Sequence, residues 1–115
     1  MDDLTRGGQS GSGAASLSRF KRARRVEEVL ADGLVLRVRE LTLSERDALD
    51  MQLAETRMPR LAILAATLSN KDGSPLFEDY HTALAEGLGD LPAATLERVF
   101  ERASSLNGIG DPEQD

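Results

Sequence analysis

The sequence contains no cysteine and only one histidine, and it has no long apolar run. The lack of cysteine excludes disulfides, thiolate metal sites and cysteine nucleophiles. No stretch approaches the roughly 18 apolar residues of a membrane-spanning helix. The first residues, Met1-Asp-Asp-Leu-Thr5, lack the basic-then-apolar layout of a secretory signal. We therefore expect a cytoplasmic protein without a membrane partner.

Charge is distributed unevenly along the 115 residues, whose net charge is −6. The chain up to Arg25 carries six basic and two acidic residues, a net +4, so the remainder carries −10. Such an acidic body argues against nucleic-acid binding by the body itself. The Gly/Ser-rich stretch Gly7–Ser16 does not repay the entropy of ordering. We predict a flexible arm over residues 1–18, one folded domain over 19–110 and a loose acidic tail over 111–115.

A β-hairpin is predicted across Val26–Arg39. Asp32-Gly33 favours a two-residue type I′ turn, which needs positive φ at both positions. That register pairs Ala31 with Leu34, Val29 with Leu36 and Glu28 with Arg37. Since a lone hairpin is marginal in water, we expect its apolar face to pack on helices.

The alternation of side chains assigns the two faces of this hairpin. The apolar face of the second strand holds Leu34, Leu36 and Val38. Arg37 and Arg39 are expected to face outward. Glu27 falls opposite Val38 on the apolar face, so we expect fraying at that end.

Four helices are expected after the hairpin, roughly over residues 42–55, 59–68, 78–86 and 92–107. Thr42 and Glu45 fit a capping box before the first helix, and Pro59 suits the first turn of the second. Leu61–Leu68 is apolar on every side, so we expect the second helix at the centre of the core. The expected apolar residues of the first and last helices are Ala48, Leu49, Met51 and Leu53, and Leu96, Val99, Phe100, Ala103 and Leu106.

The connections complete the predicted fold. Ser69–Pro75 is expected to form an exposed turn, after which Leu76-Phe77 returns to the core. Gly87 and Gly89 break the third helix, and Asn107-Gly108 ends the last one. The fold class is therefore α+β and mainly α, with an N-terminal β-hairpin packed on a bundle of about four short helices.

No set of side chains predicts catalysis or the binding of a cofactor or metal. His81 has no partner at a suitable spacing, so we interpret it as a surface or half-buried residue. Asn70–Gly73 resembles part of a calcium loop but lacks the alternating oxygen ligands, which favours a plain turn. The acidic pairs Glu27-Glu28 and Glu78-Asp79 are typical of solvated surface carboxylates. We expect no enzyme activity, and the sequence identifies no partner-binding residue.

The basic run Arg19–Arg25 has two interpretations. Clustered arginine favours phosphate contacts, and Phe20 could add an aromatic or wedge contact to nucleic acid. The alternative is a solubilising arm that pairs with the acidic body or with an acidic partner. With one aromatic residue in the run and an acidic body, nucleic acid is the less favoured of the two.

Five short phrases occur in order along the chain, namely Gly33–Asp47, Arg60–Leu68, Asp72–Phe77, Leu91–Phe100 and Ser105–Gly108. In this order and spacing they resemble the small tail assembly chaperones of long-tailed bacteriophages. The likeness spans about Phe20 to Gly110, which is most of the predicted domain. The Gly/Ser-rich arm is not part of it.

The resemblance implies a non-enzymatic chaperone in the bacterial host cytoplasm. Members of the family bind the tape measure protein while the tail tube polymerises around it, and they are absent from the finished virion. In many, a programmed ribosomal frameshift appends a second domain that recruits tail tube protein. No catalytic or ligand residues carry over, because the family has none.

Two other functional classes remain open at this point. One is a DNA-binding regulator that uses the basic arm. The other is a non-chaperone adaptor module of a prophage operon. Self-association of the protein is also left open by the sequence.

Overall fold

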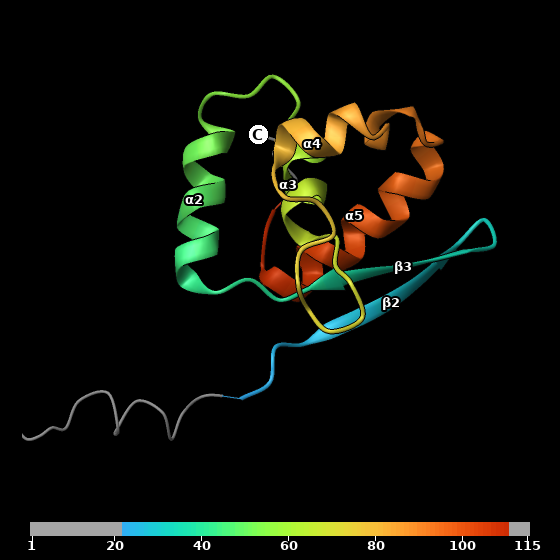
Figure 1. Ribbon diagram of the computed structural model, residues 1–115, viewed down its shortest axis with the longest axis horizontal. Coiled ribbons are helices and arrows are strands. Elements are labelled where there is room, and N and C mark those ends of the chain that lie inside the picture. Colours follow the sequence, from blue (N-terminus) through green and yellow to red (C-terminus); the bar gives the residue numbers. More distant parts are fainter. Residues whose placement is uncertain (1–21, 111–115) are drawn as a thin grey trace, which may run out of the picture.

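The computed structural model describes residues 22–110, so the expected arm over 1–18 and tail over 111–115 lie outside the described residues. Within residues 22–110, a β-hairpin is followed by four α-helices and one short 3₁₀ helix (Figure 1). In chain order the elements are β2 (Val26–Ala31), β3 (Leu34–Arg39), α2 (Leu43–Leu53), α3 (Pro59–Thr67), α4 (Tyr80–Ala85), η1 (Leu88–Asp90) and α5 (Ala93–Asn107). The predicted fold class, α+β and mainly α, is confirmed.

The hairpin has the predicted register and turn. β2 pairs antiparallel with β3, with Val29 opposite Leu36 and Ala31 opposite Leu34. The turn residues Asp32 and Gly33 have φ of 53° and 79°, as a type I′ turn requires. The Asp32 carboxylate also accepts a hydrogen bond from the Thr95 hydroxyl near the start of α5. The turn is therefore attached to the helix that covers the inner face of the hairpin.

Two predictions at the opposite end of the hairpin are wrong. That end does not fray, because Val38 is fully buried and forms an isolated β-bridge with Leu68. Glu27 lies 3.5 Å from the guanidinium of Arg102 on α5, so its charge on the apolar face is paired. Arg39 does not face solvent but is 6% exposed. This end is covered on both faces, which the alternation of one strand does not predict.

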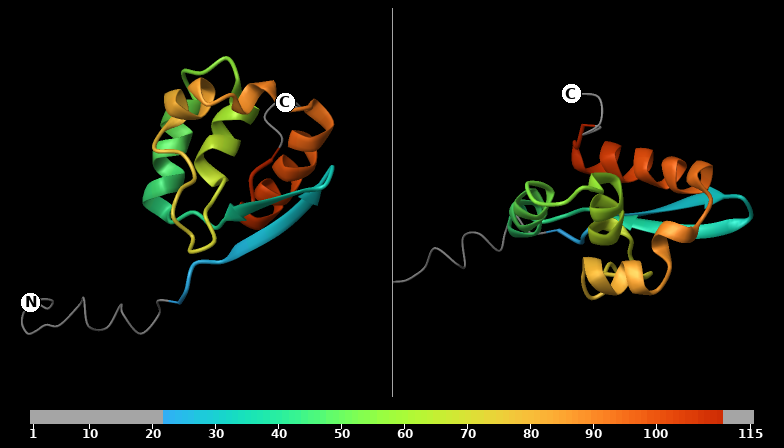
Figure 2. Two further views of the ribbon diagram at one scale, coloured as in Figure 1. Left: turned by 45° about the vertical axis from the view of Figure 1, so that its right-hand side comes forward. Right: turned by 90° about the horizontal axis from the view of Figure 1, so that it is seen from above.

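Helix α3 lies at the centre of the core, as predicted. It contacts α2, α4, η1 and α5, and the view from above shows it between α4 and α5 (Figure 2). Its fully or nearly fully buried residues are Ala62, Ile63, Leu64, Ala65 and Thr67. From α5, Val99 and Phe100 pack into the same cluster. An apolar run with no polar face thus occupies the position where every side is covered.

Helix α2 is less buried than predicted. Leu49 is 2% exposed and Leu53 packs against the core, but Ala48 is exposed and Met51 is 74% exposed. The helix lies at the edge of the bundle and packs mainly on α3. Only a narrow stripe of α2 is therefore covered, and apolar residues beside that stripe remain in solvent.

The connections also differ in detail from the prediction. Leu76 does not return to the core but is 41% exposed, whereas Phe77 packs against the core. The turn over 69–75 is not wholly exposed, because Ser69 and Gly73 are buried. Gly73 lies against Arg24 and Val26, where an added Cβ would sit 3.4 and 3.5 Å from side-chain carbons. The turn therefore folds back over the start of β2.

The helix ends follow from local chemistry. Asp79 caps α4 by accepting a hydrogen bond from the Thr82 amide. Gly108 ends α5 in the left-handed region, with φ of 64°. Between α4 and α5, Gly87 precedes η1 with a φ of 95°, and Leu88 of η1 is 3% exposed. None of the helices within residues 22–110 has the length and apolar character needed to cross a membrane.

Candidate functional surfaces

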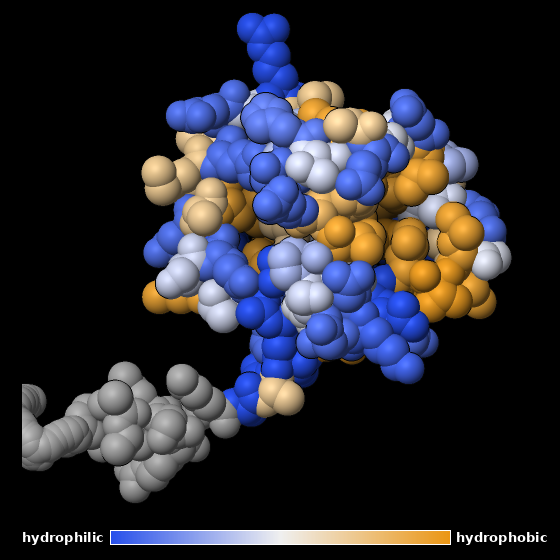
Figure 3. Space-filling model, viewed as in Figure 1, coloured by the Kyte–Doolittle hydropathy of each residue, from blue (hydrophilic) through white to orange (hydrophobic). Residues whose placement is uncertain are grey.

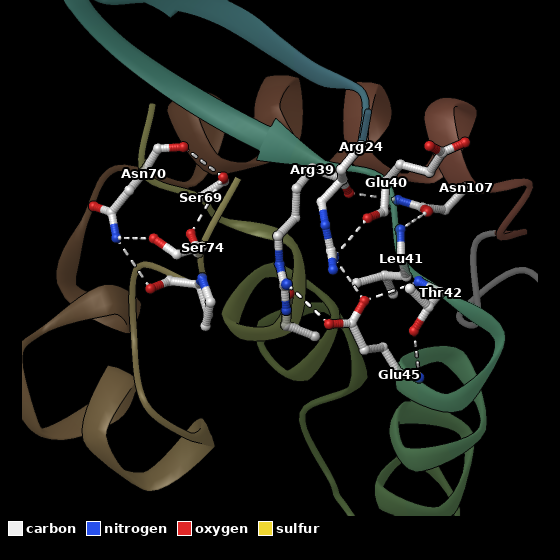
Figure 4. Close-up of polar contacts among 12 residues, drawn as sticks. Arg24, Arg39, Glu40, Leu41, Thr42, Glu45, Ser69, Asn70, Ser74 and Asn107 are labelled. Atoms are coloured by element: carbon white, nitrogen blue, oxygen red, sulfur yellow. Dashed lines mark hydrogen bonds and ion pairs between the residues drawn. The ribbon is translucent and has the colours of Figure 1, made fainter. Parts of the chain in front are cut away.

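Glu45 joins three parts of the chain in one polar junction (Figure 4). Its Oε1 accepts hydrogen bonds from the Thr42 amide at 2.8 Å and from Arg24 Nη1 at 2.6 Å. Its Oε2 accepts from Arg39 Nη1 at 3.1 Å. The Thr42 hydroxyl in turn accepts from the Glu45 amide, which completes the predicted capping box. One carboxylate therefore links the N-terminal segment, β3 and the start of α2.

The electrostatics of this junction hold Glu45 in its ionised form. Burial alone would raise the pKa of Glu45. The hydrogen bonds from Arg24 and Thr42 and the charges of Arg39 and Arg24 outweigh that effect and lower the pKa to about 2. Arg39 Nε donates to the Ala66 carbonyl at 3.1 Å, near the C-terminal end of α3, where a cation is favourable. The junction is thus suited to structural stability and not to proton transfer near neutral pH.

The end of the basic run is docked on the acidic body. Arg22 forms a two-point ion pair with Glu40, at 2.8 and 2.6 Å. Arg24 Nη1 also donates to the Glu40 carbonyl at 2.9 Å. The hydrogen bond from Arg22 and that from the Arg25 amide lower the pKa of Glu40 to about 2. Of the two interpretations of the run, Arg22 and Arg24 follow the pairing with the body, while Arg19–Lys21 lies outside the described residues.

A cleft of about 330 Å³ contains the single histidine. It lies between α2, the end of α3 and the start of α4, and it is lined in part by Arg39, Glu45, Tyr80 and His81. His81 is exposed, and its ring lies 6.0 Å from that of Tyr80. The Tyr80 hydroxyl is 3.4 Å from the Thr56 hydroxyl. Glu45, the carboxylate of the cleft that belongs to the polar junction, is already engaged by Arg24, Arg39 and Thr42.

The loop that resembles part of a calcium site is closed by its own hydrogen bonds. The Asp72 carboxylate accepts from the Ser74 amide at 2.9 Å and from the Ser74 hydroxyl at 2.6 Å. The Asn70 side chain donates to Ser74 and to the Pro75 carbonyl. Across residues 22–110, no group of three or more His, Cys, Asp or Glu residues is placed to hold a metal ion. Asp72 therefore acts as a turn residue.

The outer face of the hairpin, turned away from α5, carries exposed apolar side chains near the turn. Leu30 and Val35 are direct cross-strand partners on this face and are 65% and 50% exposed. Leu34, beside the turn on the inner face, is 46% exposed. Figure 3 shows hydrophobic residues gathered over this end of the hairpin. We call Leu30, Leu34 and Val35 the hairpin tip.

A second apolar surface is a groove of about 200 Å³ between α3, η1 and α5. We call it the α3–α5 groove, lined by Arg60, Leu61, Leu64, Gly89, Leu91, Ala93, Leu96, Glu97 and Phe100. Arg60 Nη1 lies 3.3 Å from Glu97 Oε2, and its guanidinium lies 5.9 Å from the centre of the Phe100 ring. Leu91, at one edge, is 36% exposed. The groove is thus apolar inside and charged at its rim.

Comparisons with protein-family models, curated proteins and solved structures find no match to this chain.

The sequence predicted no partner-binding residues, and the structure adds the hairpin tip and the α3–α5 groove as candidates. The tip had a signal in the sequence. Val35 stands between Leu34 and Leu36, and Leu30 between Val29 and Ala31, so both strands are apolar on both faces near the turn. A strand covered on one face only would leave one of these sets exposed.

Proposed function

We propose that this protein is a tail assembly chaperone that keeps a phage tape measure protein soluble and competent for assembly. The observation that carries the proposal is the ordered resemblance from Phe20 to Gly110. The hairpin tip supports it, because contiguous exposed apolar side chains are typical of interaction sites. The tip would contact apolar faces that the long partner exposes before the tail tube encloses it.

The charge of the chain fits this role. The segment after Arg25 carries −10, so partner molecules coated with many copies would repel one another. Each contact through three apolar side chains would be weak, and repeated contacts along a long partner would compensate by avidity. Weak single contacts would also allow arriving tube subunits to displace the chaperone.

The remaining features of the proposal follow the resemblance. The chaperone would act in the bacterial host cytoplasm and be absent from the finished virion. Recruitment of tail tube protein would depend on a longer product made by a programmed frameshift near the end of the gene. A slippery heptamer near the codons for Asn107–Asp115, followed by an overlapping frame, would support that step.

The described part of the chain offers less support for a DNA-binding regulator. Arg22 and Arg24 are engaged by Glu40 and Glu45, so they are already paired before any phosphate approaches. An adaptor module would also bind its partner through the hairpin tip, but it would not need to keep a tape measure protein soluble. Solubility therefore separates the two binding functions.

The test is co-expression with the tape measure protein encoded in the same operon. We expect that partner to move from the pellet to the soluble fraction and to co-purify with this protein. Adding tube protein should release the chaperone, and raising the salt concentration should reduce the solubility of the coated partner by screening its charge. A partner that stays insoluble with this protein in excess, and shows no interaction at low salt, would favour the adaptor.

A further inference from the structure

The α3–α5 groove is built to receive one large apolar side chain. Its walls come from Leu61 and Leu64 on α3, Leu91 after η1, and Leu96 and Phe100 on α5. Gly89 contributes no side chain, and a Cβ there would lie 3.4 Å from Leu61 Cδ1. The groove therefore stays open beside η1 partly because a glycine occupies that position.

Two carboxylates, those of Asp90 and Glu97, stand at the edge of this groove, against one guanidinium, that of Arg60. Asp90 stands between the lining residues Gly89 and Leu91 and is exposed. Glu97 remains 60% exposed although it pairs with Arg60, the single basic residue of the lining. An apolar anchor flanked by basic residues is the occupant that this combination fits.

We propose that the groove binds the segment Leu17–Lys21 of a second copy of this chain. The segment reads Leu-Ser-Arg-Phe-Lys and places one aromatic residue, Phe20, between the cations Arg19 and Lys21. It lies immediately before Arg22, which is held on the body by Glu40. Phe20 enters the groove, and Arg19 and Lys21 face Asp90 and Glu97.

Geometry favours binding to another copy over binding within one chain. Phe20 is two residues from Arg22, so their Cα atoms are at most about 7 Å apart. Glu40, which holds Arg22, precedes Leu41, whose amide donates to the Asn107 side chain at the C-terminal end of α5. Leu96, in the groove, is eleven residues earlier in α5, or about 16 Å along the helix axis. Because this separation exceeds the roughly 7 Å between the Cα atoms of Phe20 and Arg22, we infer that the groove receives the segment of another copy.

The resulting contact joins two different surfaces, the segment of one copy and the groove of the next. Such a head-to-tail interface does not close on itself unless the rotation forms a ring, so it produces rings or open chains of copies. The proposal is independent of the chaperone function, since it predicts self-association of the purified protein in the absence of any partner.

The test uses two complementary full-length variants and sedimentation equilibrium. Phe20→Ala removes the anchor and keeps the groove, whereas Leu91→Lys places a cation at the edge of the groove and keeps the segment. Mass action predicts that the weight-average mass of the natural protein rises by about two-fold or more with concentration. Each variant alone should remain a monomer. Their mixture should form dimers and nothing larger, because each pair has one intact segment and one intact groove.

Matched controls separate this interface from others. Leu43→Lys makes the same change at a leucine that is 77% exposed on α2, and Leu4→Ala truncates an apolar residue elsewhere in the N-terminal arm; both should associate like the natural protein. Association should weaken as added salt screens the charges. Thermal unfolding of Leu91→Lys checks that it is folded. A natural protein that stays monomeric at all concentrations, or association that survives both Phe20→Ala and Leu91→Lys, would overturn the proposal.

Discussion

Replacing Glu45 tests how the buried guanidinium of Arg39 is stabilised. Glu45→Ala removes the carboxylate 3.1 Å from Arg39 Nη1 and leaves a charge that is 6% exposed without that partner. Breaking a fully buried ion pair costs about 3–5 kcal/mol, but the Glu45 side chain is 32% exposed, which weakens the effect. Arg39 keeps its bond to the Ala66 carbonyl, so we expect the lower end, about 3 kcal/mol. Loss of the capping box adds about 1 kcal/mol.

Two further variants divide this cost of about 4 kcal/mol into its parts. Glu45→Gln keeps a side chain that can complete the capping box but loses the charge, and a hydrogen bond to a charged group contributes about 1.5–3 kcal/mol. Arg39→Met removes the buried charge together with its need for a partner. Glu45 then retains Arg24 and Thr42, so we expect a cost of only about 1 kcal/mol from the lost bond to Ala66.

The assay is urea unfolding followed by circular dichroism. The natural protein and the three variants are compared with a common m value, which is the slope of the unfolding free energy against urea concentration. A loss of about 4 kcal/mol is a large fraction of the 5–15 kcal/mol typical of a domain, so it is readily measured. From most to least destabilised, we expect the order Glu45→Ala, Glu45→Gln, Arg39→Met. This explanation of how Arg39 is stabilised would be refuted if Glu45→Ala lowered the free energy of unfolding by no more than about 1 kcal/mol, the cost of a lost helix cap. It would also be refuted if Arg39→Met were the most destabilising of the three variants.

The remaining predictions concern the core, the turn and the response to acid. Leu64→Ala should cost about 2–5 kcal/mol and Phe100→Ala about 3–5 kcal/mol by urea unfolding, because both leave cavities in the core; unchanged midpoints would contradict the packing. Gly33→Val should destabilise the hairpin, since φ is 79° there, while amide exchange in α5 should change less. Glu40 and Glu45 have pKa values lowered from 4.5 to about 2, so their contribution is present above pH 4.5 and lost as the pH falls toward 2. Replacing both with glutamine should make the urea midpoint of unfolding fall less steeply as the pH is lowered from 4.5 toward 2.

Local patterns predicted the elements whose chemistry lies within a few residues. The type I′ turn at Asp32-Gly33, the capping box of Thr42 and Glu45, and the stop at Gly108 each depend on adjacent residues, and all three are present. The run Leu61–Leu68, apolar on every side, likewise predicted the central position of α3.

Features that depend on distant segments were not predictable in this way. Arg39 is buried because Glu45, Arg24 and the end of α3 converge on it from three parts of the chain. Met51 is exposed because α2 lies at the edge of the bundle, which the spacing of its apolar residues does not reveal. Both outcomes depend on which element covers which face.

The hairpin tip lies between these two cases. The apolar residues on both faces of the strands were visible in the sequence, but which set would remain exposed depended on where α5 and the 69–75 loop pack. α5 covers the inner face, and the loop covers the outer face only near Val26. The outer residues beside the turn therefore remain in solvent.

The most direct test of the proposed chaperone role is the amount of tape measure protein that co-purifies with variants of the tip. Leu30→Thr with Val35→Thr removes its apolar character and keeps residues that favour strands. Leu43→Gln with Met51→Gln is the matched control, since these residues are 77% and 74% exposed on α2. Both variants should retain the unfolding midpoint of the natural protein. We expect the tip variant to lose the soluble partner and the control to keep it; equal recovery with both would contradict binding through the hairpin.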